Sequence, residues 1–299
     1  MTESNLVQTK GFYSITGIIT GKDTPKKGYG YKTGEIQKGD SKGKKYNSIR
    51  FPLKTSNNNI VDVELFGTEN THVTFYNKVE KKQMKIEWDK RNVTPPANYE
   101  LRTPAFDMVE SINKEFKDGD VVNAWGSITF STYTNSQGET VEQYKLNIGS
   151  LTKYEKELNF DDEEYKEINS FTQEIVINEV IDNSSENCLD VYAFVVNYNK
   201  TTNPASFQIN KNNVVEEFYK KFKTLKFGDF IKVNGSVLNQ SVVSIDPMWG
   251  EQVSRSFKRC LEIRGADGSS YESKKYKVAD FAKPEVETVD WNDIKELPF

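Results

Sequence analysis

Side chains able to bind a polyanion are most concentrated in residues 22–46. This stretch holds eight lysines, three acids, five glycines and three tyrosines. Lysine ammonium groups neutralise phosphates, and aromatic faces accept nucleobases of any identity. The composition predicts a flexible basic loop that contacts single-stranded nucleic acid; the alternative is a solvated surface insertion without a ligand. The candidate contacts in this loop are Lys22, Lys26, Lys27, Tyr29, Tyr31, Lys32, Lys42, Lys44, Lys45 and Tyr46.

Residue types that carry out catalysis or hold metals are sparse. The chain has one histidine, His72, and two cysteines, Cys188 and Cys260, far apart in the sequence. It contains no GxxxxGKS/T, HExxH or GxSxG motif, and Gly28-Tyr29-Gly30 is too short for a dinucleotide-binding loop. The acidic run at 161–164 is typical of a solvated linker. We therefore expect no enzyme activity, no cofactor and no metal site.

The elements that would position the basic loop are mostly strands. Alternating or β-rich segments, such as 13–20, 49–53, 60–66, 121–130 and 144–148, are separated by turn residues. Only 106–116 and 214–222 place apolar residues at helical spacing. Many short strands with few helices favour an all-β fold of small barrels.

An internal repeat indicates how these strands are grouped. The sequence GDVVNAWGSI at 119–128 recurs as GDFIKVNGSV at 228–237, and each copy follows a helical segment. A Gly-Asp turn before a strand that contains Gly-Ser resembles the fourth strand of an OB-fold, which follows the helix that plugs the barrel. A glycine within that strand, Gly126 or Gly235, suits a bent barrel strand.

The repeat predicts two tandem five-stranded OB-fold-like barrels, each with one short helix. We expect the first domain at residues 10–153, an acidic linker at 154–170, the second domain at 171–265 and a flexible acidic tail at 266–299. The tail prediction follows from a Gly/Ser-rich and then charged composition without an apolar run.

Strand parity separates a core face from an outer face in the first domain. Val122, Ala124, Gly126, Ile128 and Phe130 share the core parity. The opposite parity is polar apart from one tryptophan, which favours a stacking platform for a base; the alternative is a tryptophan covered by a loop or by the second domain. The predicted outward contacts are Arg50, Trp125, Tyr133 and Lys145.

Two further sites leave alternatives open. Lys85, Lys90 and Arg91 could extend the basic surface, or Trp88 beside them could be buried. In the second copy of the repeat, Asn234 stands where Trp125 stands in the first, so we expect the first domain to dominate binding. His72 is expected to make an ordinary loop hydrogen bond.

Charge is distributed unevenly along a chain whose net charge is −4. Residues 1–60 carry eleven Lys or Arg against four acids, a net of +7, whereas 155–187 carry two against eleven acids, a net of −9. Residues 278–299 carry two lysines against six acids, a net of −4. A basic front and acidic later segments keep binding of a polyanion possible despite the overall sign.

The C-terminal decapeptide is acidic and closes on an apolar pair. Such a peptide can place a ring in a hydrophobic pocket while carboxylates meet Arg or Lys at its rim. It resembles the C-terminal tip of bacterial and phage single-stranded DNA-binding proteins, although Lys295 interrupts the acids and Leu297 stands where Ile is usual. The residues of this predicted docking tip are Asp290, Trp291, Asp293, Ile294, Glu296, Leu297, Pro298 and Phe299.

Together, the tandem OB-like repeat, the basic aromatic loop and the acidic tip resemble a phage-encoded single-stranded DNA-binding protein. The resemblance implies binding of single-stranded DNA largely without sequence specificity during DNA replication, recombination or repair. It also implies that the tip recruits replication or recombination proteins. No signal peptide or membrane-spanning run is present, so we expect a cytoplasmic protein, monomeric or dimeric. The alternatives are a protein-interaction or virion-assembly module without nucleic-acid binding, and an RNA-binding OB protein.

Overall fold

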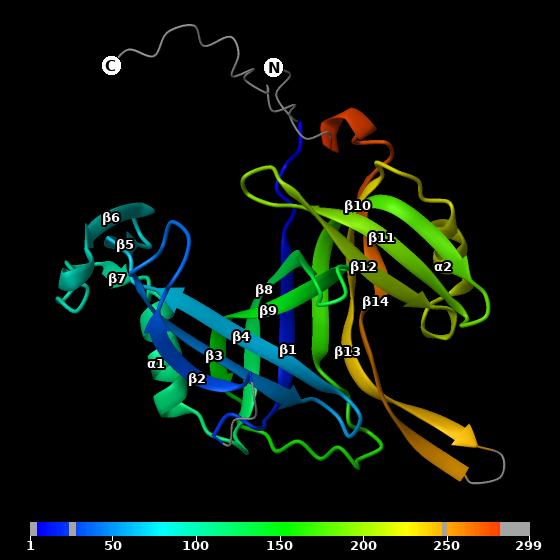
Figure 1. Cartoon of the computed structure of the whole chain (residues 1–299), viewed down its shortest axis with the longest axis horizontal. Helices are drawn as coiled ribbons and strands as arrows, with labels where there is room; N and C mark the ends of the chain where they lie inside the picture. Colours follow the sequence, from blue (N-terminus) through cyan, green and yellow to red (C-terminus); the bar gives the residue numbers. More distant parts are fainter. Residues whose placement is uncertain (1–4, 24–27, 247–249, 282–299) are drawn as a thin grey trace, which may run out of the picture.

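The computed structural model describes residues 5–23, 28–246 and 250–281. Its strands form two β-barrels that lie side by side and share one eleven-stranded sheet, with a separate three-stranded sheet at one end (Figure 1). The predicted all-β class is confirmed. Neither of the two α-helices in the described part of the chain is long and apolar enough to cross a membrane.

The first barrel has the strand order of an OB-fold. The first strand pairs with the second and the fourth, the second with the third, and the fifth with the fourth, while the third and fifth run parallel through Glu64 and Asn147. This closed ring is the arrangement that the repeat predicts. The strands are β1 (Gly11–Ile19), β3 (Lys45–Lys54), β4 (Ile60–Thr68), β8 (Val121–Thr134) and β9 (Thr140–Lys153), with helix α1 (Ala105–Glu115) before β8.

The second barrel repeats the same ring. Its third and fifth strands are again parallel, through Gln208 and Glu262, and its other neighbours are antiparallel. Helix α2 (Glu216–Lys223) again precedes the fourth strand. The strands are β10 (Asn169–Asn183), β11 (Cys188–Val196), β12 (Thr202–Asn210), β13 (Phe230–Asp246) and β14 (Gly250–Glu272).

The repeated residues perform the same structural task in both barrels. Gly119 and Gly228 adopt positive φ angles of 92° and 84°, which glycine tolerates without cost. Asp120 and Asp229 each accept a hydrogen bond from the backbone N–H three residues earlier, both at 3.0 Å. Gly-Asp therefore closes the turn that leads from the helix into the fourth strand.

The glycine inside each fourth strand marks a close approach of two strands. A Cβ on Gly126 would lie 1.8 Å from the Asn147 carbonyl oxygen, and one on Gly235 would lie 1.8 Å from that of Glu262. Each glycine lies at a register shift between the fourth and fifth strands. The core parity of β8 is confirmed as well, because Val122 and Ala124 are fully buried.

Several short elements decorate the barrels. Strand β2 (Gly30–Glu35) pairs with β3, so the predicted basic loop at 22–46 is wrong in part: it contains a hairpin strand. A three-stranded sheet of β5 (His72–Asn77), β6 (Lys82–Glu87) and β7 (Tyr99–Leu101) lies between β4 and α1. Here Trp88 is buried against Phe106, with ring centroids 5.8 Å apart. The short 3₁₀ helices are η1 (Trp88–Lys90), η2 (Lys211–Asn213) and η3 (Val278–Phe281).

The two barrels are joined by backbone pairing and by shared apolar packing. Strand β1 pairs with β10 from Gly11–Gln173 to Ile15–Asn169. The rings of Phe130 in the first barrel and Phe207 in the second lie 5.9 Å apart, and the buried residues of both barrels form one continuous cluster. A continuous core of this kind holds the barrels in a fixed relation.

Two segments expected to lie outside the barrels are packed against them. In the acidic segment 154–170, Tyr165 donates to the Thr55 carbonyl oxygen at 2.8 Å, and Glu167 accepts from Asn59 at 2.8 Å. The predicted flexible tail from 266 is wrong for its first part, because β14 extends to Glu272 and Tyr276 is buried beside Leu6. A Gly/Ser-rich composition misled the prediction, since a barrel strand can be rich in small residues.

Candidate nucleic-acid interface

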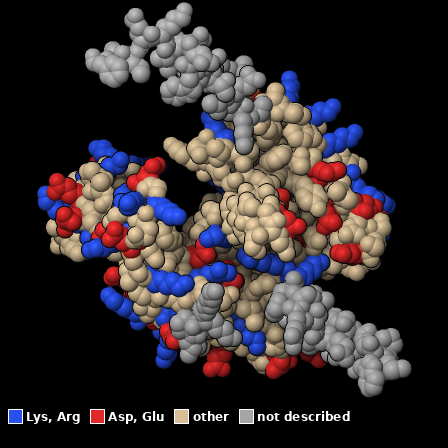
Figure 2. Space-filling view, in the orientation of Figure 1, with Lys and Arg blue, Asp and Glu red and all other residues tan. Residues whose placement is uncertain are grey.

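The outer face of β2, β3, β4 and β9 brings cations and aromatic rings together on the first barrel. Residues 28–54, which include β2 and β3, carry seven Lys or Arg against Glu35 and Asp40, a net charge of +5. Figure 2 shows Lys and Arg side chains gathered across the middle of this side of the molecule. A strip of this sign attracts phosphates.

Arg50 lies at the centre of this face in a small polar network. Its Nη2 contacts Asp62 Oδ2 at 2.8 Å, and its guanidinium lies 5.1 Å from the ring centroid of Tyr29. Tyr29 donates its hydroxyl to the same Asp62 oxygen at 3.2 Å. Partial burial opposes the charge of Arg50, but the hydrogen bond and the charge of Asp62 hold its pKa above the ordinary value.

A second ion pair and an arginine from the other barrel complete the network. Lys145 Nζ on β9 lies 2.7 Å from Glu64 Oε1 on β4. Arg259 on β14 reaches across the barrel junction, donates to the Tyr144 carbonyl oxygen at 3.1 Å and lies 4.7 Å from the centroid of the Tyr144 ring. Arg50, Lys145 and Arg259 line one shallow hollow of about 40 Å³, so three cations from two barrels converge there.

Near the N-terminal end of β3 the face carries a pair of aromatic rings. Tyr46 and Phe66 stack with centroids 5.4 Å apart and an interplanar angle of 26°. Phe66 remains 54% exposed, so a large part of its surface is open to solvent. An exposed ring beside lysines is suited to stacking a base. Tyr46 was expected here, whereas Phe66 was missed, although its alternation with Leu65 could have revealed it.

Four of the predicted lysine contacts lie on the β2–β3 hairpin, to which Tyr46 belongs. Lys32 lies opposite Ser48 and therefore shares the outer face, and it is exposed. Lys42 and Lys45 are exposed and Lys44 is half-buried. These four predicted contacts thus lie within one hairpin.

Two other predicted contacts of the basic loop, Lys22 and Tyr31, do not join this face. Lys22 is buried, its Nζ lies 2.6 Å from Asp23 Oδ1, and its backbone N–H donates to Asp118 Oδ1 at 2.7 Å. Tyr31 faces inwards: it lies opposite Ile49, packs on the core and donates its hydroxyl to Asn47 at 3.2 Å. The expected surface roles of Lys22 and Tyr31 are therefore corrected. Lys26 and Lys27 lie outside the described residues.

Trp125 is exposed as predicted but lies on another side of the barrel. Its ring stacks on Phe12 of β1, with centroids 5.5 Å apart and planes inclined by 9°, and the two rings are 48% and 39% exposed. In the closed ring of five strands, β8 and β3 are not neighbours: β9 and β4 lie between them on one side and β1 on the other. Because outward directions rotate around a closed barrel, Trp125 and Arg50 belong to different faces. Phe12, its partner, was not anticipated.

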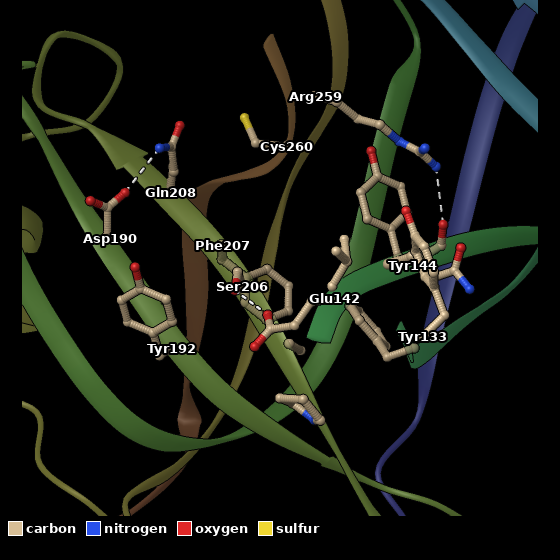
Figure 3. Close-up of a pocket in the computed structure, with 15 residues that line it drawn as sticks. Tyr133, Glu142, Tyr144, Asp190, Tyr192, Ser206, Phe207, Gln208, Arg259 and Cys260 are labelled. Carbon is tan, nitrogen blue, oxygen red and sulfur yellow. Dashed lines mark hydrogen bonds between the residues drawn. The ribbon is translucent and has the colours of Figure 1, made fainter. Parts of the chain in front are cut away.

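Tyr133 lies in a cleft between the two barrels. The cleft has a volume of about 420 Å³ and runs between the β8–β9 hairpin and strands β11, β12 and β14. Figure 3 shows Tyr133, Glu142 and Tyr144 from the hairpin, and Asp190, Tyr192 and Gln208 from the second barrel. The cleft residues of the second barrel were not predicted, because sequence spacing gives no sign that these strands face the hairpin.

The residues of the described structure offer no group of three or more His, Cys, Asp or Glu side chains that could hold a metal ion. His72, for which a loop hydrogen bond was predicted, is the first residue of β5, and its Nδ1 lies 2.9 Å from the Thr71 hydroxyl oxygen. The predicted docking tip at 290–299 lies outside the described residues.

Comparison with known proteins identifies the family. The YorF family model matches residues 30–295, which is most of the chain. The chain belongs to the YorF family. The match covers the β2–β3 hairpin, both barrels beyond β1 and the C-terminal segment. No curated protein matches this YorF sequence.

Among solved structures, this YorF chain is similar to the single-stranded DNA-binding protein of Thermus aquaticus. The wild-type protein aligns with a TM-score of 0.43 and 8% identity over 87% of this chain and 93% of that chain. A deletion and point mutant of the same protein aligns with a TM-score of 0.41 and 9% identity over 86% of this chain and 97% of that chain. The assignment of the OB-fold therefore depends on the strand pairing described above.

Proposed function

We propose that this protein binds single-stranded DNA largely without sequence specificity. The observation that supports the proposal best is the β2–β3–β4–β9 face, where Arg50, Lys145 and the hairpin lysines lie on the same strands as the Tyr46–Phe66 pair, whose Phe66 ring is exposed. Phosphates would contact the cations and bases would stack on the rings. Neither contact reads base identity, so the strand is held unpaired by shape and charge. The proposed activity is non-catalytic.

The finer role follows from the sequence resemblance. We propose that the protein acts in the host cytoplasm during phage DNA replication, recombination or repair, and that the tip at Asp290–Phe299 recruits partner proteins. The same polyanionic tip would compete with DNA for the basic face, because it is tethered to it. Deleting residues 290–299 should then tighten DNA binding at low salt and leave the affinity at high salt nearly unchanged. An unchanged affinity at both salt concentrations would exclude this competition.

The central experiment is a fluorescence anisotropy titration with labelled oligo-dT and oligo-U at two salt concentrations. A binder that neutralises several phosphates should lose affinity steeply as salt rises, with a slope of roughly 0.7 per phosphate for single strands. Similar affinities for oligo-dT and oligo-U would indicate that the 2′-hydroxyl is not read. Absence of binding to either oligonucleotide at low salt would overturn the proposal and favour the protein-interaction module.

Matched substitutions locate the path of the strand. Phe66→Ala should weaken binding by about 1–3 kcal/mol if a base stacks there. Trp125→Ala tests the face that the sequence favours and that the structure separates from Arg50. Loss in Phe66→Ala alone places DNA on the β3–β4–β9 face, and loss in Trp125→Ala alone places it on the β8–β1 side. Lys220→Gln on α2, outside both faces, serves as the charge control and should bind as the wild type does.

A further inference from the structure

The cleft between the barrels has aromatic side chains on both of its walls. The hairpin of the first barrel contributes Tyr133 and Tyr144, and the second barrel contributes Tyr192 and Phe207 (Figure 3). Tyr133 and Tyr192 remain partly exposed. A volume of about 420 Å³ is within the range of small-molecule sites. Aromatic walls around such a space suit a flat, unsaturated ring.

The walls are held in place without a ligand. Asn203 Nδ2 of the second barrel donates to the Phe130 carbonyl oxygen of the first at 2.7 Å, and the Ser206 hydroxyl donates to the Glu142 carboxylate. Arg259 fixes the other side of the hairpin through Tyr144. The site is therefore preformed, and little of the binding free energy is spent on ordering the protein side chains when a ligand enters.

The second wall brings a carboxylate, that of Asp190, to the cleft. Gln208 donates its Nε2 to Asp190 Oδ1 at 2.9 Å, which orients the amide so that Oε1 points away from Asp190. That Oε1 is buried and accepts no hydrogen bond from any residue that the structure describes. The carboxylates of Asp190 and Glu142 supply acceptors on both walls of the cleft, whereas Arg259, the cationic donor of the lining, lies where the cleft meets the hollow of Arg50 and Lys145. A ligand that carries N–H donors would complement these carboxylates.

The cleft is continuous with the basic face of the first barrel. Arg259, Tyr144 and Gln143 line both the cleft and the hollow that contains Arg50 and Lys145. A strand whose phosphates lie at Arg50 and Lys145 can therefore turn a base into the cleft without leaving the protein surface. Arg259 would contact the phosphate at the mouth.

On the basis of the proposed function, we infer that the inter-barrel cleft is a nucleobase pocket that favours bases with an exocyclic amino group. The base stacks between the tyrosines of the two barrels, and its amino group donates to the carboxylate of Asp190. Cytosine, adenine and guanine carry such a group, whereas thymine presents two carbonyl oxygens and one N–H. Carbonyl oxygens facing a carboxylate are unfavourable, so thymine is the disfavoured base.

The experiment compares oligo-dC with oligo-dT of equal length at pH 8, by anisotropy, for the wild type and four variants, of which two are controls. The wild type should bind oligo-dC about fivefold more tightly. Asp190→Asn supplies N–H donors that thymine can use, so the preference should fall to near unity. Tyr192→Ala should weaken both oligonucleotides about tenfold. Glu217→Gln on α2 controls for charge, and the exposed Tyr198→Ala controls for loss of an aromatic ring outside the cleft.

Thermal unfolding of each variant separates loss of binding from loss of fold. Wild-type binding with equal or tighter affinity for oligo-dT would overturn the inference, as would an unchanged preference in a folded Asp190→Asn variant. Either result leaves the proposed function standing, because both oligonucleotides still bind. Failure of every oligonucleotide to bind the wild type would instead reject the proposed function itself.

Discussion

Replacing Asp62 with Asn should have opposite effects on folding and on DNA binding. Asp62 accepts from both Arg50 and Tyr29, and it occupies the position that a phosphate would take on Arg50. The side chains are 39% exposed for Arg50 and 15% for Asp62, so solvent screens the pair in part. An ion pair with this exposure contributes about 0.5–1 kcal/mol to stability. The variant should lose about that much unfolding free energy.

The free energy of the Arg50–Asp62 ion pair should oppose DNA binding in the wild type. A phosphate must displace the Asp62 carboxylate before it contacts Arg50, so removing the carboxylate charge removes the competition. A gain of about 0.5–1 kcal/mol corresponds to a two- to fivefold tighter dissociation constant. Urea denaturation measures the first effect, and anisotropy with oligo-dT at low salt measures the second.

A control separates local competition from the general effect of removing one negative charge. Glu100 is paired with Lys78 at 2.6 Å on the three-stranded sheet, and both side chains are exposed. Glu100→Gln changes the net charge equally and should leave oligo-dT affinity nearly unchanged. A folded Asp62→Asn variant that binds more weakly than the wild type would refute the competition and show that Asp62 orients Arg50 for its ligand.

Three further predictions concern the fold and the cleft. Gly126→Ala should destabilise the protein by about 3 kcal/mol, the upper end for overpacking, because its Cβ would lie 1.8 Å from a carbonyl oxygen; Gly268→Ala, with nothing within 4 Å, is the control in urea denaturation. Burial raises the pKa of Cys260 to about 11, so its alkylation rate should rise until about pH 11, and bound oligo-dC should slow it. Burial alone would raise the pKa of Asp229, but hydrogen bonds from the Lys274 and Lys226 backbone and from two hydroxyls outweigh it, so the pKa is lowered overall. The ionised Asp229 therefore stabilises the fold above about pH 4, and this contribution is lost as the pH falls through the lowered pKa. Asp229→Asn should therefore cost about 1.5–3 kcal/mol at pH 7 and progressively less below pH 4, as urea titrations at several pH values would show.

The features that the sequence predicts correctly are those with a local signature. Alternation along β8 identifies which of its residues are buried, because side chains in a strand point to opposite faces whatever the strand packs against. The Gly-Asp turn recurs at 119–120 and 228–229 because both backbones need a positive φ followed by a carboxylate cap. Because this turn has a sequence signature, its two copies indicate two barrels of the same fold.

The features that it misses depend on which distant strands become neighbours. Tyr31 lies in a stretch rich in lysine and glycine, yet pairing with Ile49 turns it towards the core. No neighbour in the sequence marks Arg259 as part of a site on the first barrel, because Arg50 lies 209 residues and Asp62 lies 197 residues earlier in the chain. The β1–β10 pairing that places it there is a long-range contact without a sequence motif.

The arrangement of charge along β3 indicates where a bound strand would begin and where it would turn. One end of β3 carries the lysines of the β2–β3 hairpin, and the other end meets the acidic segment 154–170 through Thr55 and Asn59. A polyanion is repelled from the second end and attracted to the first. From Tyr46 and Phe66 the bound strand would run to Arg50. Beyond Arg50 the acidic segment 154–170 would repel it, so the strand would turn towards Arg259. The surface around Arg259 leads into the cleft. The second barrel, predicted from the sequence to be the weaker binder, would therefore supply the site that distinguishes one base from another.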